Sequence, residues 1–164
     1  GGGDVNLYGY VLNNPVYLID PWGLAWSFDD LSKSYQSRDQ MLKGIKLPKW
    51  VIDKIMASDG GSCAARMSNA FNRAGYDLLK NTSVRKVKDE CGNYYILGAH
   101  EFAEAVGITS QSYRIKGLKS IQGKQGIIYF ENFHVDLFDG RQMVGNGRIT
   151  SDYFIKPTYF LELK

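Results

Sequence analysis

The chain has 164 residues, of which 44% are hydrophobic and 13% aromatic, so it can bury one sizeable core but is short for two domains. Its formal net charge of +3 comes from scattered lysines and arginines, which form no clustered basic stripe, so nucleic-acid binding is not expected. No apolar run approaches the ~20 residues of a membrane span and no signal peptide is recognised, so we expect no membrane insertion and a separate machine for any export.

Residues 1–24 differ from the rest of the chain, because they are rich in glycine and turn-forming pairs and lack a helical period. The positions of Pro15, Asp20-Pro21 and Gly23-Leu24 closely resemble the Pro-x4-Asp-Pro-x-Gly-Leu signature at the end of the Rhs repeat-associated core. In that family the signature closes a β-shell around a carboxy-terminal toxin, and the chain is cut after the leucine. The resemblance implies that residues 1–24 are the end of an Rhs core, with Asp20 a candidate in the cut, and that residues 25–164 are the toxin domain.

The segment that follows residue 25 is predicted to be helical. Phe28, Leu31 and Tyr35 recur at three- and four-residue spacing, and Pro48 stands at the expected first position of a short helix that runs to Met56. We expect these helices to cover the next helix in the chain, and the sequence assigns them no chemistry.

The helix after Gly60-Gly61 carries the first catalytic candidate, Cys63. The residues of its expected apolar face recur at helical spacing: Ala64, Met67, Phe71 and Ala74. Ser62 is predicted to cap this helix and Gly75 to end it. A thiol at a helix N-terminus meets unpaired backbone N–H groups and the positive end of the helix dipole, which favour the thiolate. The same cysteine could also be a small buried hydrophobe, so a partner base is needed to support a catalytic role.

The middle of the chain is predicted to carry little chemistry. The polar residues 80–92 are expected to form a solvated loop, followed by a short strand at residues 94–97 and a helix at residues 99–106. His100, at the start of that helix, is expected to be a surface residue.

A β-rich run at residues 126–138 carries the second catalytic candidate, His134. Alternation places His134 and Asp136 on the same face of this run. Asp139-Gly140 is a strong turn signal, and a returning strand through residues 142–144 would set Gly145-Asn146 opposite His134. A histidine that faces a helix-terminal cysteine, with a carboxylate or amide to fix its tautomer, gives the thiolate–imidazolium pair of papain-like enzymes.

The cysteine motif Gly61-Ser62-Cys63-x-x-Arg66-Met67-Ser68 resembles that of the type VI secretion amidase effectors of the fourth class. The histidine segment 134–140 and a final strand at residues 159–161 follow in family order, so the similarity covers about residues 28–164. It implies an α+β, papain-like cysteine peptidase fold with helices packed on a small antiparallel sheet.

The same resemblance implies a function. Members of that family are antibacterial toxins that leave the producing cell by type VI secretion and act in the periplasm of the target bacterium. They cleave the γ-D-glutamyl to meso-diaminopimelate amide of peptidoglycan stem peptides, and a cognate immunity protein plugs their groove. The partners expected for this chain are therefore peptidoglycan, an immunity protein and, before release, the Rhs core shell.

Carried over to this chain, the resemblance makes Cys63 the nucleophile and His134 the general base, and it requires no metal or organic cofactor. The third catalytic member stays open. The family pattern has an aspartate about eleven residues beyond the histidine, where this chain has Gly145. Asp136 and Asn146 rank equally as replacements, with Asp152 behind them.

Three further residues are candidates for binding the substrate. Gly61 allows close approach of a substrate to the backbone, and the first helical turn at Ser62 can offer an N–H group to an oxyanion. Arg66 either binds a substrate carboxylate or makes a structural salt bridge. Phe133 stands where the family has glycine, so the pocket wall beside His134 is expected to be reshaped.

Other readings of the same residues are weighed against this one. The first is a cysteine-dependent deamidase or transglutaminase that acts on a cytosolic protein, since Rhs cores carry many unrelated toxins. A nuclease and a non-catalytic module with a packed Cys63 are weaker alternatives. A disulfide between Cys63 and Cys91 is not expected, because it would consume the nucleophile, and the cysteines and histidines lack zinc-finger spacing.

Overall fold

The computed structural model describes residues 26–57 and 62–164 of the chain. The Rhs-like signature in residues 1–24 and the predicted turn at Gly60 and Gly61 therefore lie outside the described residues. The helices are α1 (Phe28–Ser34), α2 (Arg38–Gly44), α3 (Lys49–Met56), α4 (Cys63–Arg73), α5 (Leu78–Asn81), α6 (Ala99–Val106), α7 (Ser151–Phe154) and the 3-10 turns η2 (Gln111–Tyr113) and η3 (Leu118–Ile121). The strands are β1 (Val87–Lys88), β2 (Tyr94–Tyr95), β3 (Arg114–Ile115), β4 (Gly126–Phe130), β5 (His134–Phe138) and β6 (Thr158–Glu162). Across these ranges, no helix combines the length and apolar character that a bilayer crossing needs.

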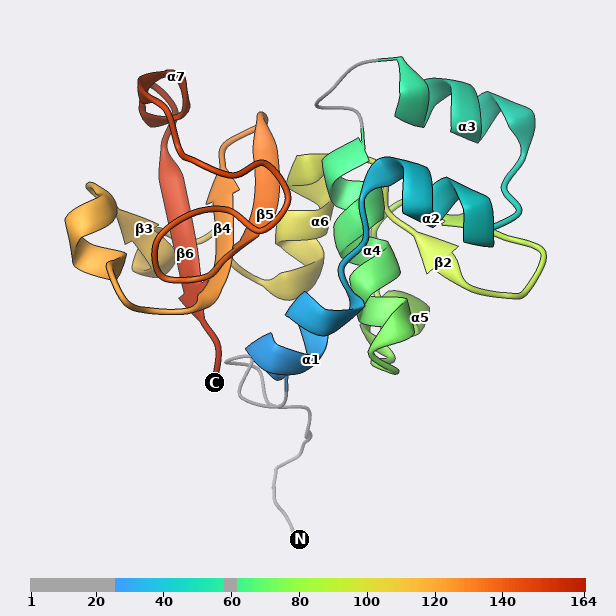
Figure 1. Ribbon diagram of the computed structural model, residues 1–164, viewed down its shortest axis with the longest axis horizontal. Coiled ribbons are helices and arrows are strands. Elements are labelled where there is room, and N and C mark those ends of the chain that lie inside the picture. Colours follow the sequence, from blue (N-terminus) through green and yellow to red (C-terminus); the bar gives the residue numbers. More distant parts are fainter. Residues whose placement is uncertain (1–25, 58–61) are drawn as a thin grey trace, which may run out of the picture.

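A four-stranded sheet forms one side of the molecule, in the order β3-β6-β4-β5 with every neighbouring pair antiparallel. Figure 1 shows α4 between this sheet and a second group made of α2, α3 and the β1–β2 pair. The predicted final strand is confirmed as β6, which lies inside the sheet. β5, which carries His134, lies at the edge of the sheet and packs against α4.

The β-rich run at residues 126–138 is a hairpin and not one continuous strand. β4 and β5 pair antiparallel, with Phe130 opposite His134 on the two sides of a tight turn. Asn132 in this turn adopts a left-handed conformation with φ 56°, and its N–H donates to the Tyr129 hydroxyl at 3.0 Å. This turn has no strong signal in the sequence, because Asn132 is flanked by Glu131 and Phe133 and not by glycine.

The cysteine helix α4 is the centre of the fold. The predicted helix is confirmed, and Gly75 follows its end with φ 86°, as expected for a glycine stop. The sequence predicted one apolar face, but all residues from Cys63 to Phe71 are buried, because α1, α2, β2, α6 and β5 all pack against the helix. The prediction of a cover formed by the preceding helices is confirmed for α1 and α2.

Polar side chains of α4 are tolerated inside the protein because each one makes hydrogen bonds to a neighbouring segment. The Ser68 hydroxyl donates to the Ala64 carbonyl at 2.8 Å and accepts from the Ile96 N–H at 2.9 Å. The Asn72 amide donates to the Tyr94 carbonyl at 2.8 Å. These bonds hold the chain around β2 against α4 and satisfy polar groups that would otherwise destabilise the core.

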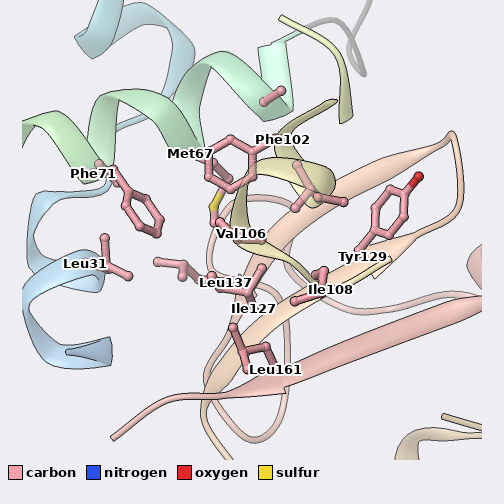
Figure 2. Close-up of a cluster of buried hydrophobic side chains, with 14 of the residues drawn as sticks. Leu31, Met67, Phe71, Phe102, Val106, Ile108, Ile127, Tyr129, Leu137 and Leu161 are labelled. Carbon is pink, nitrogen blue, oxygen red and sulfur yellow. The ribbon is translucent and has the colours of Figure 1, made fainter. Parts of the chain in front are cut away.

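The sheet is buried on both faces. Alternate residues of β4 contribute to two different apolar clusters, with Ile127 and Tyr129 on the side of α4 and Ile128 and Phe130 on the opposite side. Figure 2 shows the first cluster, in which Met67 and Phe71 of α4 and Phe102 and Val106 of α6 meet side chains from the sheet. This packing fixes α4 relative to β5 and so fixes the two catalytic candidates relative to each other.

Two predictions are corrected by the structure. The polar segment 80–92 is not only a solvated loop, because Val87 and Lys88 pair with β2 and Asp89 is buried. Asp89 can be buried because its carboxylate accepts the N–H groups of Cys91 and Asn93 and the Tyr95 hydroxyl. The predicted strand at residues 142–144 is reduced to isolated bridges through Met143.

Candidate active site

Cys63 is the first residue of α4 and is 2% exposed. Figure 1 shows this end of α4 on the same side of the molecule as the start of β5. Ser62 occupies the N-cap position, but its hydroxyl makes no capping hydrogen bond, contrary to the sequence prediction. The first-turn N–H groups beside the thiol are therefore not occupied by this hydroxyl. Cys63 and Cys91 are both free thiols, as predicted.

His134 begins β5, and the structure brings it between Cys63 and Asp136. Its Nε2 lies 2.9 Å from Oδ2 of Asp136, and the Cys63 side chain lies close enough to raise the pKa of the ring. Because Nε2 is engaged by the carboxylate, Nδ1 is the ring nitrogen left to exchange a proton with the thiol. The predicted placement of His134 and Asp136 on one strand face is confirmed by this contact.

The surroundings of His134 favour its protonated form. Burial acts to lower the pKa of His134, but the hydrogen bonds and negative charges of Asp136 and Cys63 outweigh burial and raise it from 6.5 to about 9. At neutral pH the imidazolium form of His134 is therefore favoured. This is the electrostatic arrangement that a thiolate–imidazolium pair requires.

Asp136 is fully buried and is held by four hydrogen bonds. Besides His134, its carboxylate accepts the backbone N–H groups of Leu137, Gly145 and Asn146 at 2.8, 2.8 and 3.0 Å. Two carboxylate oxygens offer about four acceptor sites, so every site is used. The carboxylate can therefore hold the imidazole ring in one orientation.

The other two candidates for the third catalytic position lie elsewhere. Asn146 reaches the site through its backbone N–H, while its side-chain amide donates to the Tyr153 hydroxyl at 3.2 Å. Asp152 is exposed in α7 and makes no hydrogen bond to His134 within the described ranges. Of these three residues, Asp136 is the one whose carboxylate contacts the imidazole ring.

Two aromatic side chains, Tyr153 and Phe133, form a wall beside His134. The Tyr153 ring meets the His134 ring edge-on with centroids 5.8 Å apart, and the Phe133 ring meets Tyr153 at 5.3 Å. Phe133 is 44% exposed, so it extends this wall toward solvent. The large side chain at this position therefore forms part of the site's edge.

Tyr35 is a site residue that sequence reasoning assigned only to the packing of a helix. Its hydroxyl is buried without a hydrogen-bond partner in the described part of the chain, and it lies close to Asp136 at Gly145. A Cβ added at Gly145 would clash with the Tyr35 hydroxyl and would lie 2.8 Å from Asp136 Oδ2. Glycine at position 145 thus leaves room for both groups. The sequence could not signal this contact, because the two residues are far apart in the chain.

Of the predicted substrate-binding residues, Ser62 and Arg66 line a cavity of about 300 Å³, and Ser62 is the chain neighbour of Cys63. The other lining residues are polar or charged: Ser37, Arg38, Asp39 and Asn146. Arg66 donates to the carbonyls of Gln36 and Gly145, both at 3.3 Å, and its guanidinium lies over the Tyr35 ring. The alternative of a structural salt bridge is not realised within the described ranges, where no carboxylate pairs with Arg66.

A known protein family matches the sequence of this chain. The sequence model of the family described as type VI secretion system amidase effector protein 4 (Tae4) matches residues 60–159, which is more than half of the 164-residue chain. No curated protein sequence matches the chain significantly.

Solved structures of Tae4 effectors are similar in fold. The Salmonella typhimurium effector bound to the immunity protein Tai4 from Enterobacter cloacae has a TM-score of 0.65 at 18% identity, over 84% of this chain and 99% of that chain. The effector from the Tae4–Tai4 complex of Enterobacter cloacae gives 0.61 at 20% identity, over 84% and 95% of the two chains. The predicted papain-like cysteine peptidase fold, with helices packed on a small antiparallel sheet, is confirmed. Together with the match over residues 60–159, this establishes that the chain belongs to the type VI secretion system amidase effector 4 family.

Proposed function

We propose that Cys63, His134 and Asp136 of this amidase effector hydrolyse an amide bond in the stem peptides of peptidoglycan. The family assignment makes the chain an antibacterial amidase directed at peptidoglycan. The observation that carries the residue roles is the placement of the His134 ring, which is hydrogen-bonded to the Asp136 carboxylate and close enough to the Cys63 side chain for that group to raise the pKa of His134.

In the first half of the reaction, the Cys63 proton resides on Nδ1 of His134 and the thiolate attacks the carbonyl carbon of the scissile amide. A C–S bond forms, and the carbonyl oxygen becomes an oxyanion. First-turn N–H groups of α4 are suited to stabilise that oxyanion, because the Ser62 hydroxyl does not occupy them. The imidazolium then gives its proton to the leaving amine, the C–N bond breaks, and a thioester on Cys63 remains.

In the second half, His134 acts as a base toward water. Nδ1 accepts a proton from the water molecule as its oxygen attacks the thioester carbonyl. The C–S bond breaks, the peptide leaves as a carboxylic acid, and the proton returns to the Cys63–His134 pair. Asp136 keeps Nε2 protonated and directed away from the thiol throughout, because its carboxylate accepts a hydrogen bond from Nε2–H.

The proposed bond is the γ-D-glutamyl to meso-diaminopimelate amide, and digestion of purified peptidoglycan tests it. Wild-type protein should release stem-peptide fragments that end at D-glutamate, as measured by mass spectrometry of the muropeptides. Cys63→Ala should release none, whereas Cys91→Ala, which removes the exposed thiol, should match wild type. Unchanged muropeptides after wild-type digestion would refute the proposed amidase role.

We also propose that the toxin acts in the periplasm of a target bacterium and is neutralised by a cognate immunity protein. The support is that solved Tae4 relatives are complexes with the immunity protein Tai4. Expression with a periplasmic signal should stop growth, and cytoplasmic expression should be tolerated. The reverse result would favour a deamidase or transglutaminase with a cytosolic target.

Finally, we propose that residues 1–24 are the end of an Rhs core from which residues 25–164 are released as the toxin domain. The support is the sequence signature of Pro15, Asp20-Pro21 and Gly23-Leu24. Mass spectrometry of the protein produced together with its Rhs shell should find a new amino terminus at Ala25, and Asp20→Asn should suppress it. An uncut chain in both proteins would contradict the proposal.

A further inference from the structure

Arg66 carries a buried charge whose hydrogen-bonding capacity is largely unused. The residue is 9% exposed, and its guanidinium donates two hydrogen bonds, each to a backbone carbonyl at 3.3 Å. A guanidinium has five N–H donors, and 3.3 Å exceeds the usual range for a strong N–H···O bond. No carboxylate of the described ranges lies within ion-pair distance of it.

An unpaired buried charge is unfavourable unless a counter-ion arrives, because burial removes the water that would solvate it. The Tyr35 ring, 5.1 Å from the guanidinium carbon, supplies some compensation but no negative charge. Arg66 lines the cavity of about 300 Å³ together with Ser37 and Arg38. Its Nε donates to Gln36 and its Nη2 to Gly145, which leaves Nη1 and the second N–H of Nη2 to bind a carboxylate through two parallel hydrogen bonds.

The position of this fork relative to the nucleophile limits which carboxylate it can bind. Arg66 follows Cys63 by three residues on α4, and side chains three apart lie on the same face, with Cβ atoms about 5–6 Å apart. In the thioester intermediate, the acyl residue of the substrate is bonded to Cys63 Sγ. A carboxylate on that acyl residue is thus held near the position of Arg66.

We propose that Arg66 determines specificity by binding a free carboxylate on the acyl residue of the substrate. This inference rests on the proposed hydrolysis, and it names the chemical group that the enzyme reads. A γ-glutamyl amide leaves the α-carboxylate free, separated from the scissile carbonyl by three carbon atoms. An α-amidated glutamyl residue presents a neutral carboxamide there, which cannot replace the charge.

Arg38 and Asp39 make the recognition selective for one negative group. Both line the same cavity, so the wall carries two positive charges and one negative charge. One bound carboxylate would neutralise the net positive charge of these three side chains. The Ser37 and Ser62 hydroxyls can donate hydrogen bonds to the carboxylate oxygens that Arg66 does not contact.

The test compares two peptides that differ only at this group, D-γ-glutamyl-diaminopimelate stem peptides with the α-carboxylate free or converted to an α-carboxamide. Wild-type protein should cleave the acid with kcat/KM about 10- to 100-fold above the amide, the range expected for one charge-assisted pair. Arg66→Gln should lower this acid-to-amide ratio to near one, and Arg66→Lys should keep part of it. The ratio is measured in the same sample, so partial unfolding of a variant does not change it.

Arg73→Gln is the matched control, because Arg73 lies on the same helix and donates to the carbonyl of Ser34 at the end of α1, but does not line the cavity. Its acid-to-amide ratio should match wild type. Equal cleavage of both peptides by wild type, or an unchanged ratio in Arg66→Gln, would overturn the inference and leave the hydrolase proposal intact. Cleavage of neither peptide by wild type would refute the proposed function itself and this inference with it.

Discussion

Two buried charges meet at Gly145, and the protein treats them in opposite ways. The Gly145 N–H donates to Asp136, whose carboxylate accepts four hydrogen bonds. The Gly145 carbonyl accepts from Arg66, whose guanidinium donates two long bonds and has no carboxylate partner in the described part of the chain. The difference separates a charge that is fixed before the substrate arrives from one that stays open to it.

The largest loss of activity is expected when the Asp136 carboxylate is replaced by a neutral group. Asp136→Asn should reduce kcat/KM by roughly 10²- to 10⁴-fold, because an amide neither fixes the His134 tautomer nor stabilises the imidazolium. Asp139→Asn is the control, since the Asp139 carboxylate accepts two backbone N–H groups and makes no hydrogen bond to the imidazole within the described ranges. Equal rates for Asp136→Asn and wild type would show that Asp136 does not act on His134.

A smaller loss, in stability and activity, is expected when a side chain is added at Gly145, next to the Tyr35 hydroxyl and the Asp136 carboxylate. In Gly145→Ala the added Cβ would meet the Tyr35 hydroxyl and the Asp136 carboxylate, so we expect the free energy of unfolding to fall by about 1–3 kcal/mol, with a loss of activity. Gly117→Ala, where a Cβ meets nothing within 4 Å, is the control in chemical denaturation. Adding Tyr35→Phe to Gly145→Ala should recover part of the loss, and failure of this rescue would place the strain elsewhere.

The pH dependence of activity also tests Asp136, because the Asp136 carboxylate helps to raise the pKa of His134. Because the pKa of His134 is raised to about 9, activity that needs the imidazolium should persist above pH 7 and decline as pH rises through 9. The stabilisation from this raised pKa is present below pH 6.5 and is likewise lost as pH approaches 9. In Asp136→Asn the alkaline decline should move toward pH 6.5. An identical profile in both proteins, from kcat against pH, would exclude Asp136 as the cause.

The smallest change in stability is expected when the Tyr35 hydroxyl is removed. Tyr35→Phe removes a buried group with no acceptor in the described ranges, so the free energy of unfolding should stay constant or rise, by at most about 1 kcal/mol. The Arg66 guanidinium would keep its aromatic contact with the ring. A clear loss of stability in thermal unfolding would reveal a hydrogen bond that this hydroxyl makes in solution.

The sequence predicted the catalytic elements because their signals are local. Helical spacing placed Cys63 at the start of α4, and strand alternation placed His134 and Asp136 on one face of β5. Both patterns depend on neighbouring residues only, and both are confirmed. The fold class followed from the resemblance of the cysteine motif and of the histidine segment to a known family.

The choice among Asp136, Asn146 and Asp152 could not be predicted from spacing. It depends on how the segment after Gly140 returns to β5, and this segment makes isolated bridges where a regular strand was expected. Tyr35 was missed for a related reason, since its contact with the site joins the residue that follows α1 to the loop at Gly145. The segment around Asp89 was predicted to be solvated because it is rich in charged residues. Asp89 is nevertheless buried, because the backbone N–H groups of Cys91 and Asn93 donate hydrogen bonds to its carboxylate.

The most direct test of the catalytic account compares the two thiols within one molecule. Cys63 is 2% exposed and Cys91 is exposed, so accessibility alone favours alkylation of Cys91. If His134 holds Cys63 as a thiolate, iodoacetamide at pH 7 should modify Cys63 faster than Cys91, and His134→Ala should slow Cys63 about tenfold or more without changing Cys91. Slower modification of Cys63 than of Cys91, with no response to His134→Ala, would contradict the account.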